Sequence, residues 1–327
     1  MFAIAPIALL LVFSLLRITG NPIEAALGDK LPADEIARRV ALAGLDRPLL
    51  VQFWEYLQQI TVGNFGLTIN NIEVGPHILK HLAATLEVTI IGVVLLAIAV
   101  LIGGGLAAWY SNRFLDKLII GSSILTFALP GFLGAVILRE LANAFVPEFE
   151  TTGRLSLSNQ IRWISAADST GFIVVDAIKM GDYSMLADAL FHLILPGVAL
   201  ALTAGTLIRV FRDSLYSQFQ STQQTAAINR GIPRFRVFWR HSLAPALPTV
   251  LAGFGVTIGA YITGVVFVER VFEIRGLGFL LVEAILDRDF LLVQGIFIIT
   301  FLIVIALNTL VDIAITLLDK RQREVLI

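Results

Sequence analysis

Residues 225–248, TAAINRGIPRFRVFWRHSLAPALP, form the segment around which the rest of the chain can be placed. Four arginines, at positions 230, 234, 236 and 240, make this segment too basic to lie in a bilayer. Apolar stretches flank it on both sides, at residues 189–207 and 246–268. Because Lys and Arg close to a membrane span resist translocation, we predict a cytoplasmic loop between two transmembrane helices.

The same segment has a local pattern. Ala226 and Ala227 favour a helix, Gly231 can end it at small steric cost, and Pro233 suits the first turn of a second helix. The second half mixes arginines with apolar bulk, so helix, glycine turn, helix is the predicted shape, with a basic and aromatic surface left for a partner. The alternative is a solvated loop whose helix lies on lipid headgroups.

Composition indicates an all-α integral membrane protein. The chain has 327 residues, of which 57% are hydrophobic and 15% are charged, and its mean hydropathy is +0.84. A soluble domain carries about 25% charged residues. The absence of cysteine excludes disulfides and thiolate metal sites. Nucleic acid binding is not expected, because the basic residues follow membrane sidedness and form no continuous patch.

We predict six transmembrane helices, of which the last five form a permease core at residues 82–319. The spans are residues 1–20, 82–109, 118–145, 189–211, 246–268 and 291–318. The connections are an external loop with short amphipathic helices (21–81), a second polar region (146–188), a cytoplasmic loop (212–245), a dipping external helix (269–290) and a tail (319–327). A cleaved signal peptide is the alternative for the first span, but no basic residue precedes its apolar run. The predicted inner segments hold about twice the density of Lys and Arg, which places both termini in the cytoplasm.

No energy source of its own is visible in the chain. There is no GxxxxGK[ST] phosphate loop, no HExxH metal motif and no G-x-S-x-G nucleophile setting, so we predict no catalytic residue and no metal ligand. Ionisable residues occur only near the ends of the spans. For Glu87 we expect snorkelling or a local partner, not a proton relay, and for Arg139 and Glu140 we expect interfacial anchors, not a substrate site. A secondary transporter or channel would show inverted repeats or mid-membrane charges, and neither is found.

The spacing of Ala226-Ala227, Gly231 and His241-Ser242-Leu243 resembles the EAA loop in membrane subunits of ABC importers, in the version of the dipeptide and oligopeptide permeases. Further matching positions are Ala84-Thr85-Leu86-Glu87, Val268-Glu269, Val271-Phe272, Gly276-Leu277-Gly278, Ala284-Ile285, Arg288-Asp289, Val293-Gln294-Gly295, Asn308 and Asp312. The resemblance covers nearly the whole chain. It is specific for the B-type permease subunit of a dipeptide, oligopeptide or nickel importer.

The resemblance implies a type I importer fold in a bacterial cytoplasmic membrane, with surrounding lipid. It also implies a homologous second permease subunit that completes a heterodimer. Two cytoplasmic ATPase subunits that bind ATP and Mg, and an external solute-binding protein, complete the assembly. Peptides are the expected substrate, and nickel or another small solute of the same family is the alternative. The chain departs from the family pattern at two positions of this loop. Thr225 stands where many members have an acidic residue, and the motif's proline, expected directly after Leu243, appears two residues after it as Pro245.

Three sets of candidate residues follow. The resemblance implies that the cytoplasmic loop inserts into a groove on the ATPase, and we call residues 212–245 the coupling loop. Its expected ATPase-docking residues, with Gly231 as pivot, are Thr225, Ala226, Ala227, Arg230, Gly231, Pro233, Arg234, Arg236, His241 and Leu243. Helix-packing or pathway candidates are Pro130, Phe132, Gly255, Gly259 and Gly264. External surface candidates are Glu269, Gly276, Gly278, Arg288 and Asp289.

Overall fold

A computed structural model describes residues 32–42, 45–146, 150–164 and 169–318, together with residues 10, 13, 14 and 24. This part of the chain is helical, apart from one isolated bridge between Leu67 and Glu73. Four of its helices are long and apolar enough to cross a membrane, and a bent pair provides a fifth span if it is counted as one. The predicted first span, 1–20, falls almost entirely outside the described residues, and the tail, 319–327, falls entirely outside them, so the six-span count stays a prediction.

The chain divides into two compact units, and each is described by itself. Unit 1 comprises Met1–Thr85 and Arg275–Ile305, and unit 2 comprises Leu86–Ile274 and Ala306–Ile327. Two long helices, α5 (Val74–Ala99) and α17 (Phe290–Leu318), contribute to both units.

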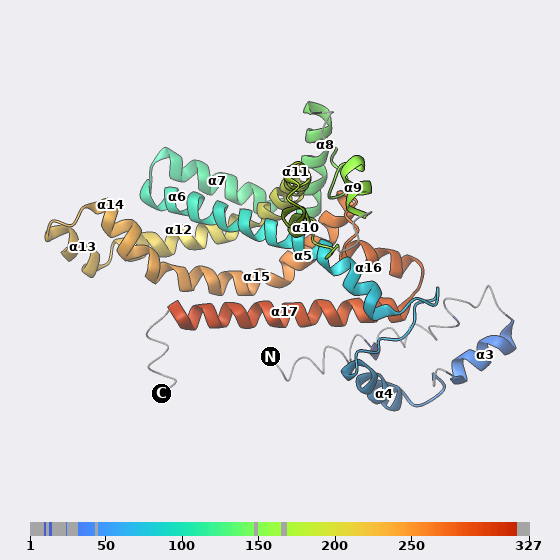
Figure 1. Ribbon diagram of the computed structural model, residues 1–327. Coiled ribbons are helices and arrows are strands. Elements are labelled where there is room, and N and C mark those ends of the chain that lie inside the picture. The colour runs from blue at the N-terminus through green and yellow to red at the C-terminus, as the bar shows by residue number, and fades with distance from the viewer. Residues whose placement is uncertain are drawn as a thin grey trace. The chain divides into compact units, whose positions relative to one another are not determined.

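Unit 1 contains α3 (Ala33–Leu42), α4 (Leu49–Thr61), the start of α5, α16 (Leu277–Leu286) and the start of α17 (Figure 1). Its core joins Val74 and Ile78 of α5 to apolar residues of α16 and α17. A Cβ atom on Gly295 would lie 2.7 Å from Val74, so the missing side chain lets α17 pack closely on α5. Helix α5 begins eight residues before the predicted span at 82, because Val74 and Ile78 in its first two turns are buried in the core of this unit.

Unit 1 also corrects three of the predicted external surface residues. Gly276, Gly278 and Asp289 are buried, and only Arg288 of this group is exposed. Asp289 is buried because it caps α17: its carboxylate accepts from the backbone N–H of Leu292 at 3.1 Å and from that of Ile69 at 2.9 Å.

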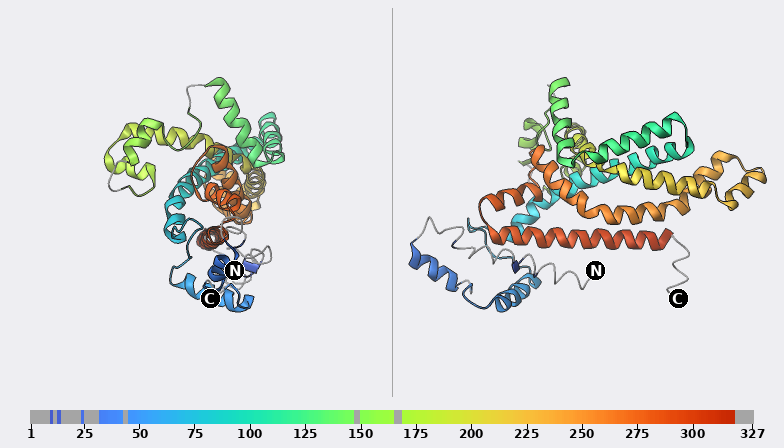
Figure 2. Two further views of the ribbon diagram at one scale, coloured as in Figure 1. Left: turned by 90° about the vertical axis from the view of Figure 1, so that its right-hand side faces the viewer. Right: turned by 180° about the vertical axis from the view of Figure 1, so that it is seen from behind.

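Unit 2 is built on continuous helical rods. The first continues α5 through a π-helical turn η1 (Val100–Gly104) into α6 (Gly105–Trp109). The second joins α11 (Tyr183–Ala201), η2 (Leu202–Ala204) and α12 (Gly205–Phe219). The third joins α14 (Arg234–Arg236), η3 (Val237–Ser242) and α15 (Leu243–Val271). Helices α12 and α15 pack side by side (Figures 1 and 2), and the predicted spans 189–211 and 246–268 lie within these longer rods.

The predicted span 118–145 is the clearest departure from expectation. In place of one kinked helix, α7 (Phe114–Ala128) and α8 (Gly131–Phe145) meet at 105° (Figure 2). Leu129 and Pro130 are extended, with ψ of 128° and 132°. Proline lacks the N–H that would continue the hydrogen-bond ladder and restricts the residue before it to extended conformations, so the helix ends here.

The predicted polar region 146–188 contains a small lobe. Helices α9 (Leu157–Ile164) and α10 (Ile173–Met180) pack against the start of α11. The apolar core of the lobe is Leu155, Ile173, Ala177, Met185 and Ala189.

Candidate functional site

The predicted coupling loop, 212–245, contains a helix, a glycine turn and a second helix. Helix α13 (Thr222–Asn229) is followed by Gly231 with φ +90° and then by α14. The N–H of Gly231 donates to Ile228 O at 2.9 Å, and the N–H of Ile232 donates to Ala227 O at 3.2 Å. This pair of bonds is a Schellman cap, which requires a left-handed residue at the glycine position.

Aromatic packing joins the coupling loop to the ends of the rods. The fully buried Phe238 ring lies 4.9 Å from the ring of Trp109, 5.2 Å from that of Phe219 and 5.1 Å from that of Trp239. Trp239 in turn packs on Gly105, where a Cβ atom would lie 2.7 Å from the indole. The cluster therefore connects α6, α12 and η3, so that displacement of one of them would displace the others.

A buried polar contact closes the loop. The side-chain amide of Gln224 on α13 donates to the backbone carbonyl of His241 at 3.2 Å. Thr225, which occupies the acidic position of the family motif, is exposed, and its hydroxyl donates to Ser221 O at 3.2 Å. It therefore contributes a hydrogen bond within its own helix and no charge.

The outer surface of the coupling loop is basic. Arg230, Arg234, Arg236 and Arg240 are all exposed, and the guanidinium of Arg234 lies 5.6 Å from the ring centroid of Phe219. The remaining predicted docking residues lie on the same short segment: Pro233 and His241 are exposed, and Ala226, Ala227 and Leu243 are half-buried.

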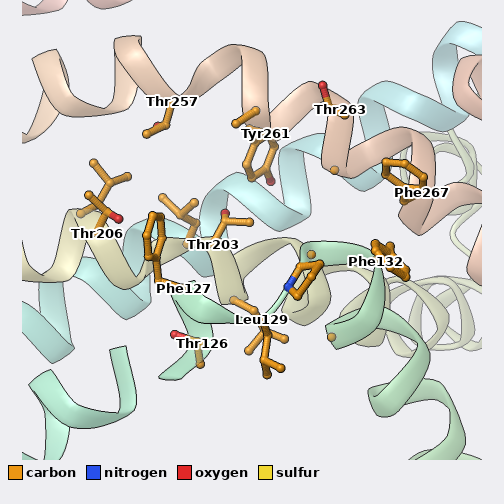
Figure 3. Close-up of a pocket in the computed structure, with 18 residues that line it drawn as sticks. Thr126, Phe127, Leu129, Phe132, Thr203, Thr206, Thr257, Tyr261, Thr263 and Phe267 are labelled. Carbon is orange, nitrogen blue, oxygen red and sulfur yellow. The ribbon is translucent and has the colours of Figure 1, made fainter. Parts of the chain in front are cut away.

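A cavity of about 420 Å³ opens where α7 and α8 part. Figure 3 shows hydroxyl and aromatic side chains from the α7–α8 break, η2, α12 and α15 converging on it. We call it the threonine cavity, after Thr126, Thr203, Thr206, Thr257 and Thr263. None of the described residues that line it is charged.

The threonine cavity includes three of the five pathway candidates. Pro130, Phe132 and Gly264 line it, and the Phe132 ring lies 5.8 Å from the ring of Phe267. Gly255 and Gly259 do not line it. A Cβ atom on Gly255 would lie 3.5 Å from Val311, consistent with helix packing, whereas one on Gly259 would meet nothing within 4 Å.

The hydroxyls of the threonine cavity were not singled out from the sequence. Thr206 is notable because its Oγ1 is buried and has no hydrogen-bond partner among the described residues. Tyr261, also in the lining, donates to the carbonyl of Thr89 at 3.4 Å. The available signal was the helical spacing of hydroxyl residues, such as Thr203 with Thr206 and Thr257 with Tyr261.

Glu87 pairs with Arg154, which lies 67 residues away in the sequence. The Arg154 guanidinium donates to Glu87 Oε2 at 2.8 Å and to Gly171 O at 3.0 Å, and the Val174 N–H donates to Glu87 Oε1 at 2.7 Å. The two charged side chains are only 5% and 14% exposed. This buried pair fixes the α9–α10 lobe to α5.

Two other charged residues near this end of unit 2 have fixed positions. Arg139 donates to Glu273 at 3.2 Å and to the carbonyl of Val271, which ties α8 to the end of α15. Glu269, predicted as an external surface residue, is instead fully buried. The predicted exposure of Glu269 was wrong because the position of a residue along α15 does not show which side of that helix is covered by other elements.

The lobe also contains a buried carboxylate, Asp176, which is 1% exposed. Its Oδ1 accepts from the Thr170 hydroxyl at 2.6 Å, and its Oδ2 accepts from the Trp163 indole N–H at 2.9 Å. Burial opposes ionisation, but these hydrogen bonds outweigh it and hold the pKa of Asp176 below its ordinary value.

Comparison with known proteins places the chain in a family. Residues 99–324 match the Binding-protein-dependent transport system inner membrane component. The chain is 29% identical over 318 residues to the di/tripeptide transport system permease protein DppB of Pseudomonas aeruginosa, covering 96% of this chain and 93% of the relative. It is 27% identical over 321 residues to the dipeptide transport system permease protein DppB of Escherichia coli, covering 96% and 93%. The chain therefore belongs to the binding-protein-dependent transport system inner membrane component family and is a permease subunit of an ABC importer.

Proposed function

We propose that this subunit forms half of the translocation pathway of an ATP-driven importer for dipeptides and oligopeptides. The named function of the relatives, dipeptide or di/tripeptide transport, supports the substrate class. In the proposed assembly, an external solute-binding protein delivers the peptide and a homologous second permease completes the pathway. Two cytoplasmic ATPase subunits bind ATP and Mg. Both termini of this chain lie in the cytoplasm of a bacterium, and the helices cross its cytoplasmic membrane.

One observation carries the mechanism: the coupling loop packs against the rods on both sides of it. Gln224 connects α13 to the start of the third rod, and Phe238 connects that rod to α6 and α12. When ATP binding closes the two ATPase subunits, the groove on the ATPase that holds the coupling loop moves with them. The aromatic cluster then transmits this motion to α12 and α15, and the pathway opens outward to accept a peptide. Hydrolysis returns it to the inward state.

The threonine cavity suits a peptide in transit. Four of its five threonine hydroxyls already donate to carbonyls about one helical turn earlier, so they can accept from peptide N–H groups whatever the side chains are. Phe132 and Phe267 offer apolar contact. The absence of a fixed charge among the described lining residues means that acidic and basic peptides would not be held there by an ion pair. Weak contacts of this kind allow release, which transport requires.

The test uses the assembled complex. Residues 225–240 are replaced by a Gly-Ser segment of equal length, and copurification of the ATPase subunits with the permease pair is measured. We expect the ATPases to be lost while membrane insertion is kept. Full retention of the ATPases would overturn the docking role.

Substrate class is tested separately, by uptake of labelled Ala-Ala and of radioactive Ni²⁺ into proteoliposomes that hold the intact complex and its binding protein. ATP-dependent uptake of the dipeptide is the expected result. Uptake of Ni²⁺ alone would favour the nickel-importer alternative, and uptake by the isolated chain would show a stand-alone transporter.

A further inference from the structure

A second cavity, also of about 420 Å³, lies between α7 and α12 and shares no residue with the threonine cavity. We call it the basic groove. Its lining is Asp116, Lys117, Ile120, Gly121, Ile124, Arg209, Arg212 and Asp213. A Cβ atom on Gly121 would meet nothing within 4 Å, so this side of α7 is open.

Both acidic residues of the basic groove are paired with Arg212. Its guanidinium donates to Asp116 at 2.6 Å and 3.1 Å in a bidentate pair, and to Asp213 at 2.8 Å. Asp116 also accepts from the Asn112 N–H at 2.8 Å. These contacts leave Asp116 with little capacity to pair with another cation, and the three cations of the groove outnumber its two carboxylates.

Lys117 and Arg209 are the cations that remain. Neither forms an ion pair with any residue in the described ranges. The Arg209 guanidinium lies 5.6 Å from the ring centroid of Phe127, which holds it at the groove. Its Nε is buried and has no hydrogen-bond partner among the described residues. The chain itself covers this Nε, so the donors that Arg209 can offer to a ligand in the groove are on its terminal Nη atoms.

The rest of the basic groove is apolar. Ile120 and Ile124 lie one and two turns along α7 from the first-turn residue Lys117, and Ile124 is 50% exposed. A ligand that fits must therefore carry a negative charge at one end and a hydrocarbon chain next to it. Free phosphate satisfies the first requirement only.

We propose that the basic groove binds the headgroup of an anionic phospholipid. The phosphate accepts from Arg209 and Lys117, and an acyl chain lies along Ile120 and Ile124. Arginine suits phosphate because its planar fork presents paired donors, and basic pockets between transmembrane helices bind anionic headgroups. Bound there, the lipid joins α7 to α12, the helix that leads into the coupling loop.

The probe is phosphatidylglycerol. The intact importer complex is placed in nanodiscs of phosphatidylcholine with graded amounts of phosphatidylglycerol, and retained lipid is measured by native mass spectrometry. We expect Lys117→Gln and Arg209→Gln each to weaken retention of phosphatidylglycerol about fivefold, the effect of removing one interfacial cation. Arg113→Gln is the matched control, because it removes one positive charge four residues before Lys117 but does not line the groove.

Three outcomes would overturn the proposal. The groove variants and the Arg113→Gln control could retain equal amounts of phosphatidylglycerol, or the unmodified subunit could retain phosphatidylcholine as well as phosphatidylglycerol. Alternatively, millimolar inorganic phosphate could displace the bound phosphatidylglycerol. The last would indicate a soluble phosphate ligand. If the complex with Arg209→Gln does not assemble, the Lys117→Gln variant tests the proposal, because Lys117 is exposed and its replacement should not disturb folding. Lipid retention is measured without ATP or peptide, so its result does not depend on the proposed transport function.

Discussion

Gly231 is the residue on which the shape of the coupling loop depends. Its φ of +90° is a conformation that side chains rarely adopt, and a Cβ atom there would meet nothing within 4 Å. The penalty for a substitution is therefore conformational and not a clash. We expect Gly231→Val to cost about 1 kcal/mol or more at this turn and to uncouple ATP hydrolysis from peptide uptake. Both rates are measured in proteoliposomes that hold the complete complex.

The control at this position is Gly231→Asn. Asparagine adopts the left-handed conformation more readily than other residues with a side chain, so it should keep most of the uptake. Normal coupling in the valine variant would show that the turn is not the pivot.

Glu87 and Arg154 form the buried ion pair of the lobe. In Glu87→Gln, the amide oxygen can still accept from the Val174 N–H, but the Arg154 cation is left buried without its counter-charge. We expect a loss of about 3 kcal/mol in the stability of unit 2, measured by thermal unfolding in detergent. Glu273→Gln, at the more exposed pair with Arg139, should cost less than about 1 kcal/mol. Similar losses in the two variants would contradict the assigned burial.

At the scale of elements, the α9–α10 lobe is predicted to respond to acid through Asp176. A carboxyl whose pKa is lowered by folding contributes stability above its unfolded pKa, about 3.9, and this contribution is lost as pH falls through the folded value. The lobe should therefore keep its packing from neutral pH to about pH 4 and loosen below it. Fluorescence of Trp163, kept as the single tryptophan, reports the change because its indole N–H binds this carboxylate.

The control is Asp176→Asn. It should lower the stability of the lobe at neutral pH and remove this part of the acid transition. An unchanged acid transition in the variant would assign it to other carboxylates, such as Glu87, which accepts from the first turn of the same helix.

The break between α7 and α8 creates the threonine cavity. A substitution at Thr206 can distinguish a role in protein stability from a role in peptide transport. Thr206→Val keeps the shape but removes a hydroxyl that is buried without a partner among the described residues. Unfolding stability should be unchanged or slightly raised, since no hydrogen bond of the described chain is lost. If peptides pass through the cavity, uptake should fall severalfold. Uptake equal to that of the unmodified subunit would remove Thr206 from the pathway.

For the whole molecule, we predict that the four exposed arginines of the coupling loop make the proposed docking of the ATPases depend on salt. Replacing Arg230, Arg234, Arg236 and Arg240 with glutamine should weaken copurification of the ATPases and make the remaining association less sensitive to ionic strength, because exposed charges are screened. ATPase retention is compared at low and high salt. The same salt dependence in variant and unmodified subunit would mean that the arginines serve topology alone.

The sequence alone was sufficient for the membrane class, for the family and for the order helix, glycine turn, helix around Gly231. These depend on local properties: the length of apolar runs, the density of Lys and Arg, and the freedom of glycine to adopt a positive φ. The first span and the sidedness remain predictions.

Only the tertiary structure determined the 105° break at Pro130, the pairing of Glu87 with Arg154, and the burial of Glu269 and Asp289. A proline permits either a kink or a full break, and packing of neighbouring helices selects between them. The threonine cavity and the basic groove arise in the same way, from side chains on helices that are far apart in the chain. Hydropathy and charge order determine which segments enter the membrane, whereas the environment of each side chain depends on contacts between segments.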